Sequence, residues 1–143
     1  MKKYKIIIDT NLWISLLIGK RTTDMYSLCN SDVVDVYICD ELTDEFERIA
    51  SHQKIRKYVA NERVFQTLDL MNASCILSPI AHSTVSSVLR DVNDMYLLSL
   101  ADAVKADFIL TGDKDLLSLQ SHNQTKIVTF REFEAILQKI IKL

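Results

Sequence analysis

Glycine and proline are scarce in this sequence, with two glycines and one proline among its 143 residues. Linkers between domains are commonly rich in these residues, and no linker, internal repeat or low-complexity segment is evident. The length suits one hydrophobic core, so we expect a single domain over residues 1–143. Neither a Walker loop nor a Rossmann glycine motif occurs, so no nucleotide cofactor is indicated.

Cysteine and histidine are also few, and they do not form disulfide or zinc motifs. The cysteines are an odd number with no paired spacing: Cys29, Cys39 and Cys75. This pattern favours the reduced thiols of a cytosolic protein over a disulfide framework. The histidines are scattered along the chain, at His52, His82 and His122, so a zinc site is not indicated.

Long apolar runs and a large excess of charge are absent. The apolar stretches at 12–18 and 95–101 fall far short of the roughly 18 residues that a membrane-spanning helix needs. The N-terminus is basic and then apolar, but its apolar run stops at Asp9, short of a signal-peptide core. These features predict a cytoplasmic protein. With a formal net charge of -2, nucleic-acid binding would need local basic clusters.

Strands and helices are predicted to alternate along the chain. The predicted strands cover 4–9, 34–39, 74–77, 107–111 and 126–130. The predicted helices cover 11–18, 22–30, 40–52, 60–73 and 94–105, followed by a C-terminal helix. This order predicts an α/β fold with a parallel sheet covered by helices on both faces. In such sheets the site lies beyond the carboxyl ends of the strands.

Two acids follow strongly apolar predicted strands. Asp9 comes after the isoleucines at 6–8, and Asp113 comes after FILTG at 108–112. An acid that caps a helix N-terminus and complements its dipole explains either residue taken singly. Both acids lie where this fold class binds its ligand, so the pair favours a site.

The predicted helix at 40–52 supplies a third acid. Its apolar residues have the spacing of a helix that faces the core: Leu42, Phe46, Ile49 and Ala50. Glu45 lies at the edge of this stripe, so its carboxylate can reach toward the interior. The alternative is an edge glutamate that lies near Arg48 or Lys54.

A fourth acid begins the predicted helix at 94–105. The inward face of this helix contains Leu97, Leu100, Ala101 and Val104. Asp94 begins the same side in the first turn, and Asp91 comes three residues earlier. A capping role explains one of these two acids well but explains both less well.

Three or four carboxylates gathered at one sheet edge would repel one another and perturb one another's pKa values. A hard divalent cation relieves this repulsion, because Mg²⁺ and Mn²⁺ prefer oxygen ligands. Such an ion can activate water and stabilise the charge that develops on a phosphoryl oxygen. The acids therefore favour metal-dependent phosphoryl chemistry.

Four short motifs carry a family resemblance: DTN at 9–11, ELTDEF at 41–46, RDVND at 90–94 and TGDKDLL at 111–117. In this order they resemble the PIN-domain ribonuclease family, and most closely its bacterial toxin components of toxin–antitoxin systems. The resemblance covers nearly the whole chain. It implies a three-layer α/β/α sandwich around a parallel sheet of about five strands. It also implies Mg²⁺- or Mn²⁺-dependent endonucleolytic cleavage of single-stranded RNA.

The family's catalytic and metal-binding quartet matches four acids here: Asp9, Glu45, Asp94 and Asp113. Supporting residues match four further positions: Asn11, Asp91, Thr111 and Asp115. Two departures leave roles open. The glutamate helix also offers Glu41, although the stripe favours Glu45. Asn93 stands where relatives often carry aspartate, which leaves the division of roles between Asp91 and Asp94 open.

Candidate RNA-binding cations form two local clusters: Lys20 and Arg21, and then Lys54, Arg56 and Lys57. Solvated helix ends explain these clusters equally well. Trp13 could stack on a base, but its helical spacing with Leu16 and Leu17 favours a place in the core.

Three other functions compete with the ribonuclease. An aspartyl phosphatase also places an acid after its first strand, but DTNLW at 9–13 lacks the second aspartate and the Gly-Thr of such enzymes. A receiver-type signalling domain also clusters acids at strand ends. A non-catalytic scaffold that binds metal, RNA or protein is the third. The resemblance further implies an antitoxin partner and a homodimer.

Overall fold

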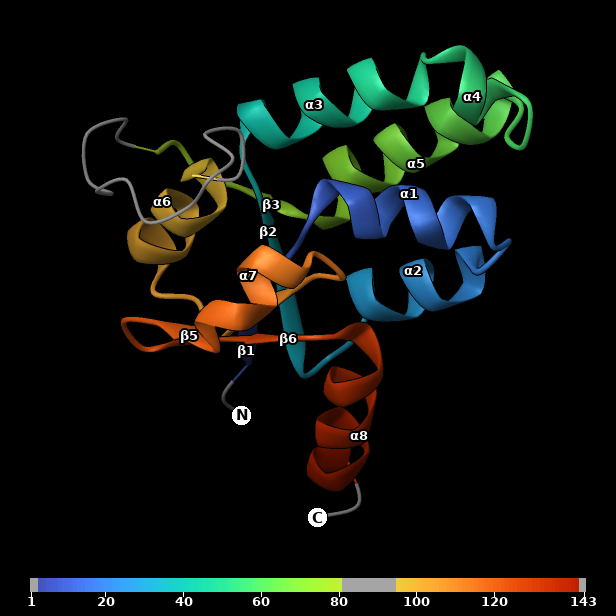
Figure 1. The fold of residues 1–143 in the computed structure, drawn as a ribbon. Helices are drawn as coiled ribbons and strands as arrows, with labels where there is room; N and C mark the ends of the chain where they lie inside the picture. The colour runs from blue at the N-terminus through green and yellow to red at the C-terminus, as the bar shows by residue number, and fades with distance from the viewer. Residues whose placement is uncertain (1–2, 81–94, 142–143) are drawn as a thin grey trace.

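The computed structural model describes residues 3–80 and 95–141, which form a mixed α/β fold (Figure 1). Its strands are β1 (Tyr4–Ile8), β2 (Val34–Ile38), β3 (Ile76–Leu77), β4 (Phe108–Leu110), β5 (Ser121–His122) and β6 (Thr125–Val128). Its helices are α1 (Thr10–Ile18), α2 (Thr22–Cys29), α3 (Asp40–Ala50), α4 (Gln53–Arg56), α5 (Asn61–Ser74), α6 (Met95–Val104), α7 (Lys114–Leu119) and α8 (Phe130–Ile141). Each predicted strand and helix is present, with ends shifted by one or a few residues.

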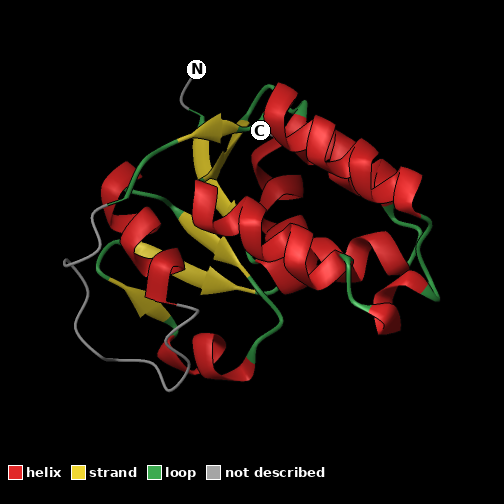
Figure 2. Ribbon diagram, turned by 90° about the horizontal axis from the view of Figure 1, so that it is seen from above, coloured by secondary structure: helices red, strands yellow, loops and turns green. Residues whose placement is uncertain are grey.

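The described strands form one six-stranded sheet in the order β3-β2-β1-β4-β6-β5. The first five are parallel, and β5 joins the edge antiparallel to β6. Figure 2 shows helices on both sides of this sheet. The predicted α/β/α sandwich around about five parallel strands is therefore confirmed. The two residues of β5 are too few to show a strand periodicity, which is why sequence patterns missed it.

Strand β1 occupies the centre of the sheet, between β2 and β4. Its residues Ile6, Ile7 and Ile8 are completely buried. A strand covered by helices on both faces has no solvent side, so its sequence is a continuous apolar run. The side chain that follows this run, Asp9, is delivered to the carboxyl edge of the sheet.

The chain order reverses at β1. Strands β2 and β3 lie on one side of it, and β4 and β6 lie on the other. The backbone N–H of Asp9 donates to the carbonyl of Leu110 at 2.9 Å, so the ends of β1 and β4 are held together. In open α/β sheets the crevice at such a reversal is the usual place for a ligand.

Helix α3 packs against α1, α5 and α6. Leu42, Phe46 and Ala50 are buried, while Ile49 is half-buried. The predicted apolar stripe is thus confirmed, and Glu45 lies at its edge, half-buried. Within the described ranges, no helix is both long enough and apolar enough to cross a membrane.

Two short helices were not predicted. Helix α4 forms a single turn after α3, and α7 follows Asp113, whose side chain caps it. Neither spans enough residues to show an amphipathic period. Both helices nevertheless place residues at the surface. Helix α4 forms a corner of the molecule, and α7 begins at the carboxyl edge of the sheet.

Two cysteines that are far apart in sequence lie side by side. The Sγ atoms of Cys29, at the end of α2, and Cys75, directly after α5, are 3.8 Å apart. Both are free thiols, as is Cys39. The sequence spacing did not reveal this pair, because the packing of α2 against α5 brings the two residues together.

Candidate functional site

Asp9 is a fully buried carboxylate at the carboxyl edge of the central strand. Its Oδ2 atom accepts a hydrogen bond of 2.7 Å from the Thr111 hydroxyl. Its Oδ1 atom caps α1 by accepting from the backbone N–H of Asn11 at 3.4 Å. The side chain of Asn11 itself is exposed, so the contact seen between Asn11 and Asp9 is made by the backbone N–H.

The environment of Asp9 opposes its ionisation. Burial is the largest influence and raises the pKa of the carboxyl, and the nearby charge of Asp113 raises it further. The Thr111 hydroxyl and the backbone N–H groups of Thr10 and Asn11 act in the opposite direction without cancelling the effect of burial. Burying an acid in this way costs stability unless a positive charge joins it.

Thr111 connects two of the predicted acids. Besides donating to Asp9, its Oγ1 atom accepts from the backbone N–H of Asp113 at 3.0 Å. Thr111 is 1% exposed, so its bond with Asp9 is buried, while the bond from Asp113 is partly buried. The hydroxyl therefore connects the loop between β4 and α7 to the end of β1.

Asp113 caps α7. Its Oδ1 atom accepts from the backbone N–H of Asp115 at 2.7 Å and of Leu116 at 3.4 Å. The capping explanation given by the sequence is therefore correct, yet Asp113 also lies near enough to Asp9 to influence its pKa. Asp115 is exposed in the first turn of the same helix.

The capping role of Asp113 can be separated from its charge. Asp113→Ala should lower the free energy of unfolding by about 1 kcal/mol, because α7 loses its cap. Asp113→Asn keeps a side-chain oxygen at this position and should change stability by less than about 0.5 kcal/mol. Urea denaturation in the presence of a chelator measures both values. Equal losses in the two variants would mean that the charge, and not the cap, stabilises this loop.

Glu45 lies near enough to Asp9, Thr10 and Tyr96 for all three to influence its pKa. Burial raises the pKa of Glu45, and the charge of Asp9 raises it further, while hydrogen bonding with Thr10 and Tyr96 lowers it. The Oγ1 of Thr10 and the Oη of Tyr96 are 2.8 Å apart. The prediction that Glu45 reaches inward agrees with this arrangement. Arg48, on the same helix, also lowers the pKa of Glu45.

Sequence reasoning missed Thr10 and Tyr96. Thr10 is fully buried and lies directly between Asp9 and Asn11, the two residues of the DTN motif that were predicted to belong to the site. Tyr96 lies in the first turn of α6, two residues after Asp94 in the sequence. The signal available in the sequence was that each of these hydroxyl residues lies within two positions of a predicted acid, Asp9 or Asp94. A side chain that connects α1 to α6 cannot be recognised before the sheet order is known.

Two predicted acids, Asp91 and Asp94, lie outside the described residues. In the part of the chain that the structure covers, no three His, Cys, Asp or Glu side chains gather closely enough to hold a metal ion. The described ion pairs join Lys3 to Asp35, Arg21 to Asp24 and Glu134, and His122 to Asp102. Among the described side chains, therefore, no Lys, Arg or His nitrogen lies within 4 Å of the carboxylates of Asp9, Glu45 or Asp113.

The donor chemistry at this edge fits a hard divalent cation. Asp9, Glu45 and Asp113 offer only carboxylate oxygens, and the negative charges of neighbouring acids raise the pKa values of Asp9 and Glu45. Oxygen ligands that carry negative charge are those preferred by Mg²⁺ and Mn²⁺. The described residues would supply part of such a site.

The two predicted basic clusters differ. Arg21 is used by the fold, because it pairs with Asp24 at 2.7 Å and its guanidinium lies 4.9 Å from the centre of the Phe130 ring. Lys20 beside it is exposed. The second cluster is fully at the surface around α4, where all three of its cations are exposed: Lys54, Arg56 and Lys57. Trp13 is completely buried, as its spacing predicted.

Several known proteins are similar to this chain in sequence or in fold. The PIN domain profile matches residues 5–115. The uncharacterized protein MJ1680 of Methanocaldococcus jannaschii is 32% identical, with 97% of this chain and 95% of that protein covered. A domain of a functionally unknown protein from the same organism has a similar structure, with a TM-score of 0.53, 14% identity, and coverage of 89% of this chain and 90% of that chain.

The structure of the PIN domain endonuclease Utp24 is also similar, with a TM-score of 0.47 and 18% identity over 78% of this chain and 72% of that chain. The family profile covers well over half of the sequence, including β1, α3 and β4. It also includes Asp9, Glu45 and Asp113. Because this profile matches well over half of the sequence, the chain belongs to the PIN domain family.

Proposed function

We propose that this protein is a divalent-metal-dependent endoribonuclease that hydrolyses phosphodiester bonds of single-stranded RNA. PIN domains are generally nucleases, which gives the reaction class. The observation that carries the proposal is the buried Asp9 carboxylate, whose pKa is raised by burial and by Asp113. A buried acid with no neutralising partner among the described residues is unfavourable in the free protein and useful to a protein that binds a cation.

Asp9, Asp94 and Asp113 would hold Mg²⁺ or Mn²⁺, with Glu45 completing the site directly or through water. When bound, such an ion supplies Lewis-acid stabilisation of charge on the phosphoryl oxygens and lowers the pKa of water. Asp91 and Asp115 would act from outside this group. Thr111 holds Asp9 in place, which fixes the direction in which Oδ1 is presented.

Glu45 would orient or deprotonate the attacking water. Its pKa is raised by burial and by Asp9, which brings the carboxyl closer to the range useful for accepting a proton. The hydroxyl groups of Thr10 and Tyr96, which are 2.8 Å apart, lower the pKa of this carboxyl and so favour its charged form. In-line attack on the phosphodiester would leave a 5′-phosphate and a 3′-hydroxyl.

The biological role that the sequence motifs favour is the toxin of a toxin–antitoxin pair in the cytoplasm. Such a toxin would have a protein antitoxin as partner, and a homodimer would place two sites in one assembly. These proposals rest on the order of the four motifs, from DTN at 9–11 to TGDKDLL at 111–117.

The experiment that tests the activity compares Glu45→Gln with the wild type on a single-stranded RNA in Mg²⁺ and in Mn²⁺. We expect metal-dependent cleavage by the wild type and a loss of about a hundred-fold in kcat for Glu45→Gln, the usual size of a proton-transfer contribution. Asp44→Asn is the matched control, because Asp44 precedes Glu45 on α3 and is exposed. This control should retain wild-type activity.

Other outcomes would select a different function. If the wild-type protein neither binds metal nor cleaves RNA, it would be a non-catalytic scaffold. Hydrolysis of small phosphoesters with no cleavage of RNA would indicate the phosphatase instead. Equal activities of Glu45→Gln and the wild type would remove Glu45 from the proposed chemistry.

A further inference from the structure

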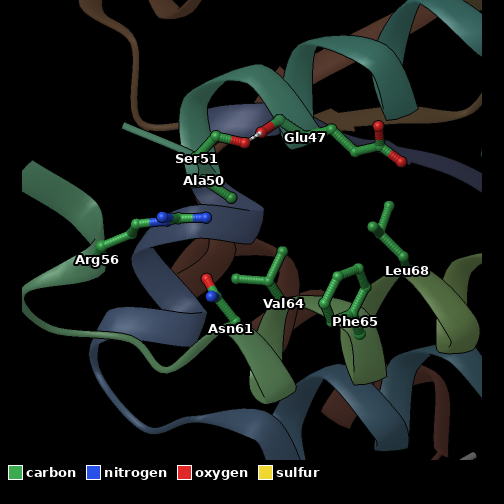
Figure 3. Close-up of a pocket in the computed structure, with 8 residues that line it drawn as sticks. All are labelled: Glu47, Ala50, Ser51, Arg56, Asn61, Val64, Phe65 and Leu68. Atoms are coloured by element: carbon green, nitrogen blue, oxygen red, sulfur yellow. Dashed lines mark hydrogen bonds between the residues drawn. The ribbon is translucent and has the colours of Figure 1, made fainter. Parts of the chain in front are cut away.

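A surface hollow lies between the end of α3 and the first turns of α5, away from the acids described above. Its volume is about 190 Å³, and its lining is partly polar and partly apolar: Glu47, Ala50, Ser51, Arg56, Asn61, Val64, Phe65 and Leu68. Figure 3 shows the guanidinium of Arg56 directed into the hollow from one end, with Phe65 and Leu68 at the other. The site of the proposed reaction uses none of these residues.

An exposed aromatic ring forms one wall of this hollow. Phe65 is 65% exposed, whereas the other four phenylalanines of the chain are buried. Tyr58, which precedes α5, is 69% exposed. A single exposed apolar side chain is ordinary, but an exposed ring in a hollow beside a guanidinium has the composition of a base-stacking site.

Positive charge is concentrated around the same hollow. The segment from 48 to 63 contains five of the seventeen Lys and Arg residues of the chain but only one of its nineteen Asp and Glu residues. The ion pairs among the described residues involve none of these five cations. A local basic surface on a protein with a net charge of -2 favours a polyanionic ligand at this corner.

We propose that this corner, formed by Arg56, Asn61, Phe65 and the flanking Lys54 and Lys57, binds single-stranded RNA. A base would stack on the Phe65 ring, the Asn61 amide would face the base edge, and Arg56 would contact a phosphate. The proposal rests on the ribonuclease function, because RNA is the ligand that this function supplies. An unpaired strand is required, since bases in a duplex do not expose their faces for stacking.

The two ends of the hollow differ in charge, which orients the ligand. Figure 3 shows the Glu47 carboxylate at the Leu68 end and directed away from Arg56. Phosphate is therefore favoured at the Arg56 end and disfavoured beside Glu47. The apolar surface of Leu68 and Phe65 at the opposite end suits a base.

The corner is separate from the proposed reaction centre. Ala50 follows Glu45 by five residues on α3, which turns it about 140° around the helix axis and moves it about 7.5 Å along it. The pKa of Glu45 responds to Thr10 of α1 and Tyr96 of α6, while the hollow is lined by residues of α5. Contacts with RNA in the hollow would increase affinity for RNA without taking part in the cleavage step. Its loss should raise Kd and KM while kcat stays unchanged.

The test measures fluorescence anisotropy of a labelled oligouridylate of about 12 nucleotides, within the range of known single-strand sites. The full chain is used in EDTA, so that binding is separated from cleavage. Phe65→Leu keeps apolar volume but removes the ring, and it should weaken binding about five- to fifty-fold. Arg56→Gln should weaken binding and reduce the slope of log Kd against log salt by about 0.7. Tyr26→Leu is the control, an exposed aromatic on α2 that should bind as the wild type does.

Each result decides for or against the corner. Wild-type Kd in both Phe65→Leu and Arg56→Gln, with unchanged melting temperatures, would overturn the proposal. Displacement of the oligonucleotide by polyglutamate at equal charge concentration would instead identify an acidic protein segment as the occupant. If the variants bind weakly but the wild type cleaves no RNA with either metal, the ribonuclease function fails while the RNA-binding corner stands. Normal cleavage with no effect of either substitution leaves the ribonuclease and removes the corner.

Discussion

Asp9→Asn should reduce RNA cleavage by about a thousand-fold or more while the metal-free protein becomes no less stable. The loss corresponds to about 4 kcal/mol of transition-state stabilisation, as expected when a carboxylate that holds a catalytic metal ion is neutralised. The metal-free variant should not be less stable than the metal-free wild type, because Asn avoids the cost of burying a charge. Asp9 is completely enclosed, and its pKa is raised above its ordinary value of 3.8 mainly by desolvation.

The pH dependence of stability isolates this effect. Because the folded state raises the pKa of Asp9, its favourable contribution is complete below 3.8 and is lost as pH rises through the folded pKa. Metal-free wild type should therefore lose stability relative to Asp9→Asn as the pH rises from 3.8 through the raised folded pKa of this carboxyl. Glu45, whose pKa is also raised, is present in both proteins and largely cancels in the difference. Urea denaturation in EDTA across this range gives the comparison.

Adding Mn²⁺ provides the complementary measurement. A cation that binds the folded state alone raises the melting temperature, and it should do so for the wild type but not for Asp9→Asn. Equal stabilisation of the two proteins by Mn²⁺ would contradict the proposed role of Asp9 in holding the ion. A large loss of stability in metal-free Asp9→Asn would show that the capping bond with Asn11 outweighs the cost of burial.

Thr111→Val should destabilise the protein by about 2–3 kcal/mol at neutral pH and also impair cleavage. The substitution preserves shape but removes the hydroxyl that donates to Asp9 at 2.7 Å and accepts from the N–H of Asp113 at 3.0 Å. The Oδ2 atom of the buried Asp9 carboxylate and the backbone N–H of Asp113 then lose the hydrogen bonds that the hydroxyl made. Hydrogen bonds to charged groups carry larger contributions than neutral ones. The pKa of Asp9 should rise further, because the hydroxyl that lowers it is gone.

Two controls distinguish the site from ordinary packing. Thr111→Ser keeps the hydroxyl and should retain most of the activity. Thr125→Val removes another buried hydroxyl, one that donates to the carbonyl of Ala106 at 2.7 Å, so it should lower stability without a comparable loss of cleavage per folded molecule. Chemical denaturation and single-turnover kinetics give the two quantities separately. Wild-type kcat in folded Thr111→Val would show that Asp9 is held adequately by its backbone contacts.

The fold could be predicted from the sequence because its apolar patterns are long. The isoleucines at 6–8 predict a buried strand, and the apolar stripe that ends at Ala50 predicts a helix packed on the core. Both patterns are confirmed. The predictions failed where structure depends on few residues or on distant contacts. Helix α4 has four residues, and the pair Cys29–Cys75 exists only because α2 packs on α5.

The candidate site was predictable to the extent that strand ends determine it. Asp9, Thr111 and Asp113 follow β1 and β4, which are neighbours in the sheet, so a parallel topology is enough to bring them together. Glu45 required the helix stripe as well. Tyr96 could not be selected, because its contact with Thr10 depends on how α6 packs over the edge of the sheet, and no local pattern encodes this.

The position of β1 at the chain reversal divides the site between two halves of the sequence. Asp9 and Glu45 come from the segment before residue 81, and Thr111 and Asp113 come from the segment after residue 94. The register of Ile6 against Phe108 and of Ile7 against Ile109 joins these segments. Neither segment alone contains all of these residues. If the protein were divided into two fragments between these segments, the acids would come together only when the fragments reassemble. Cleavage of RNA would then serve as a complementation signal, driven by apolar pairing of two strands.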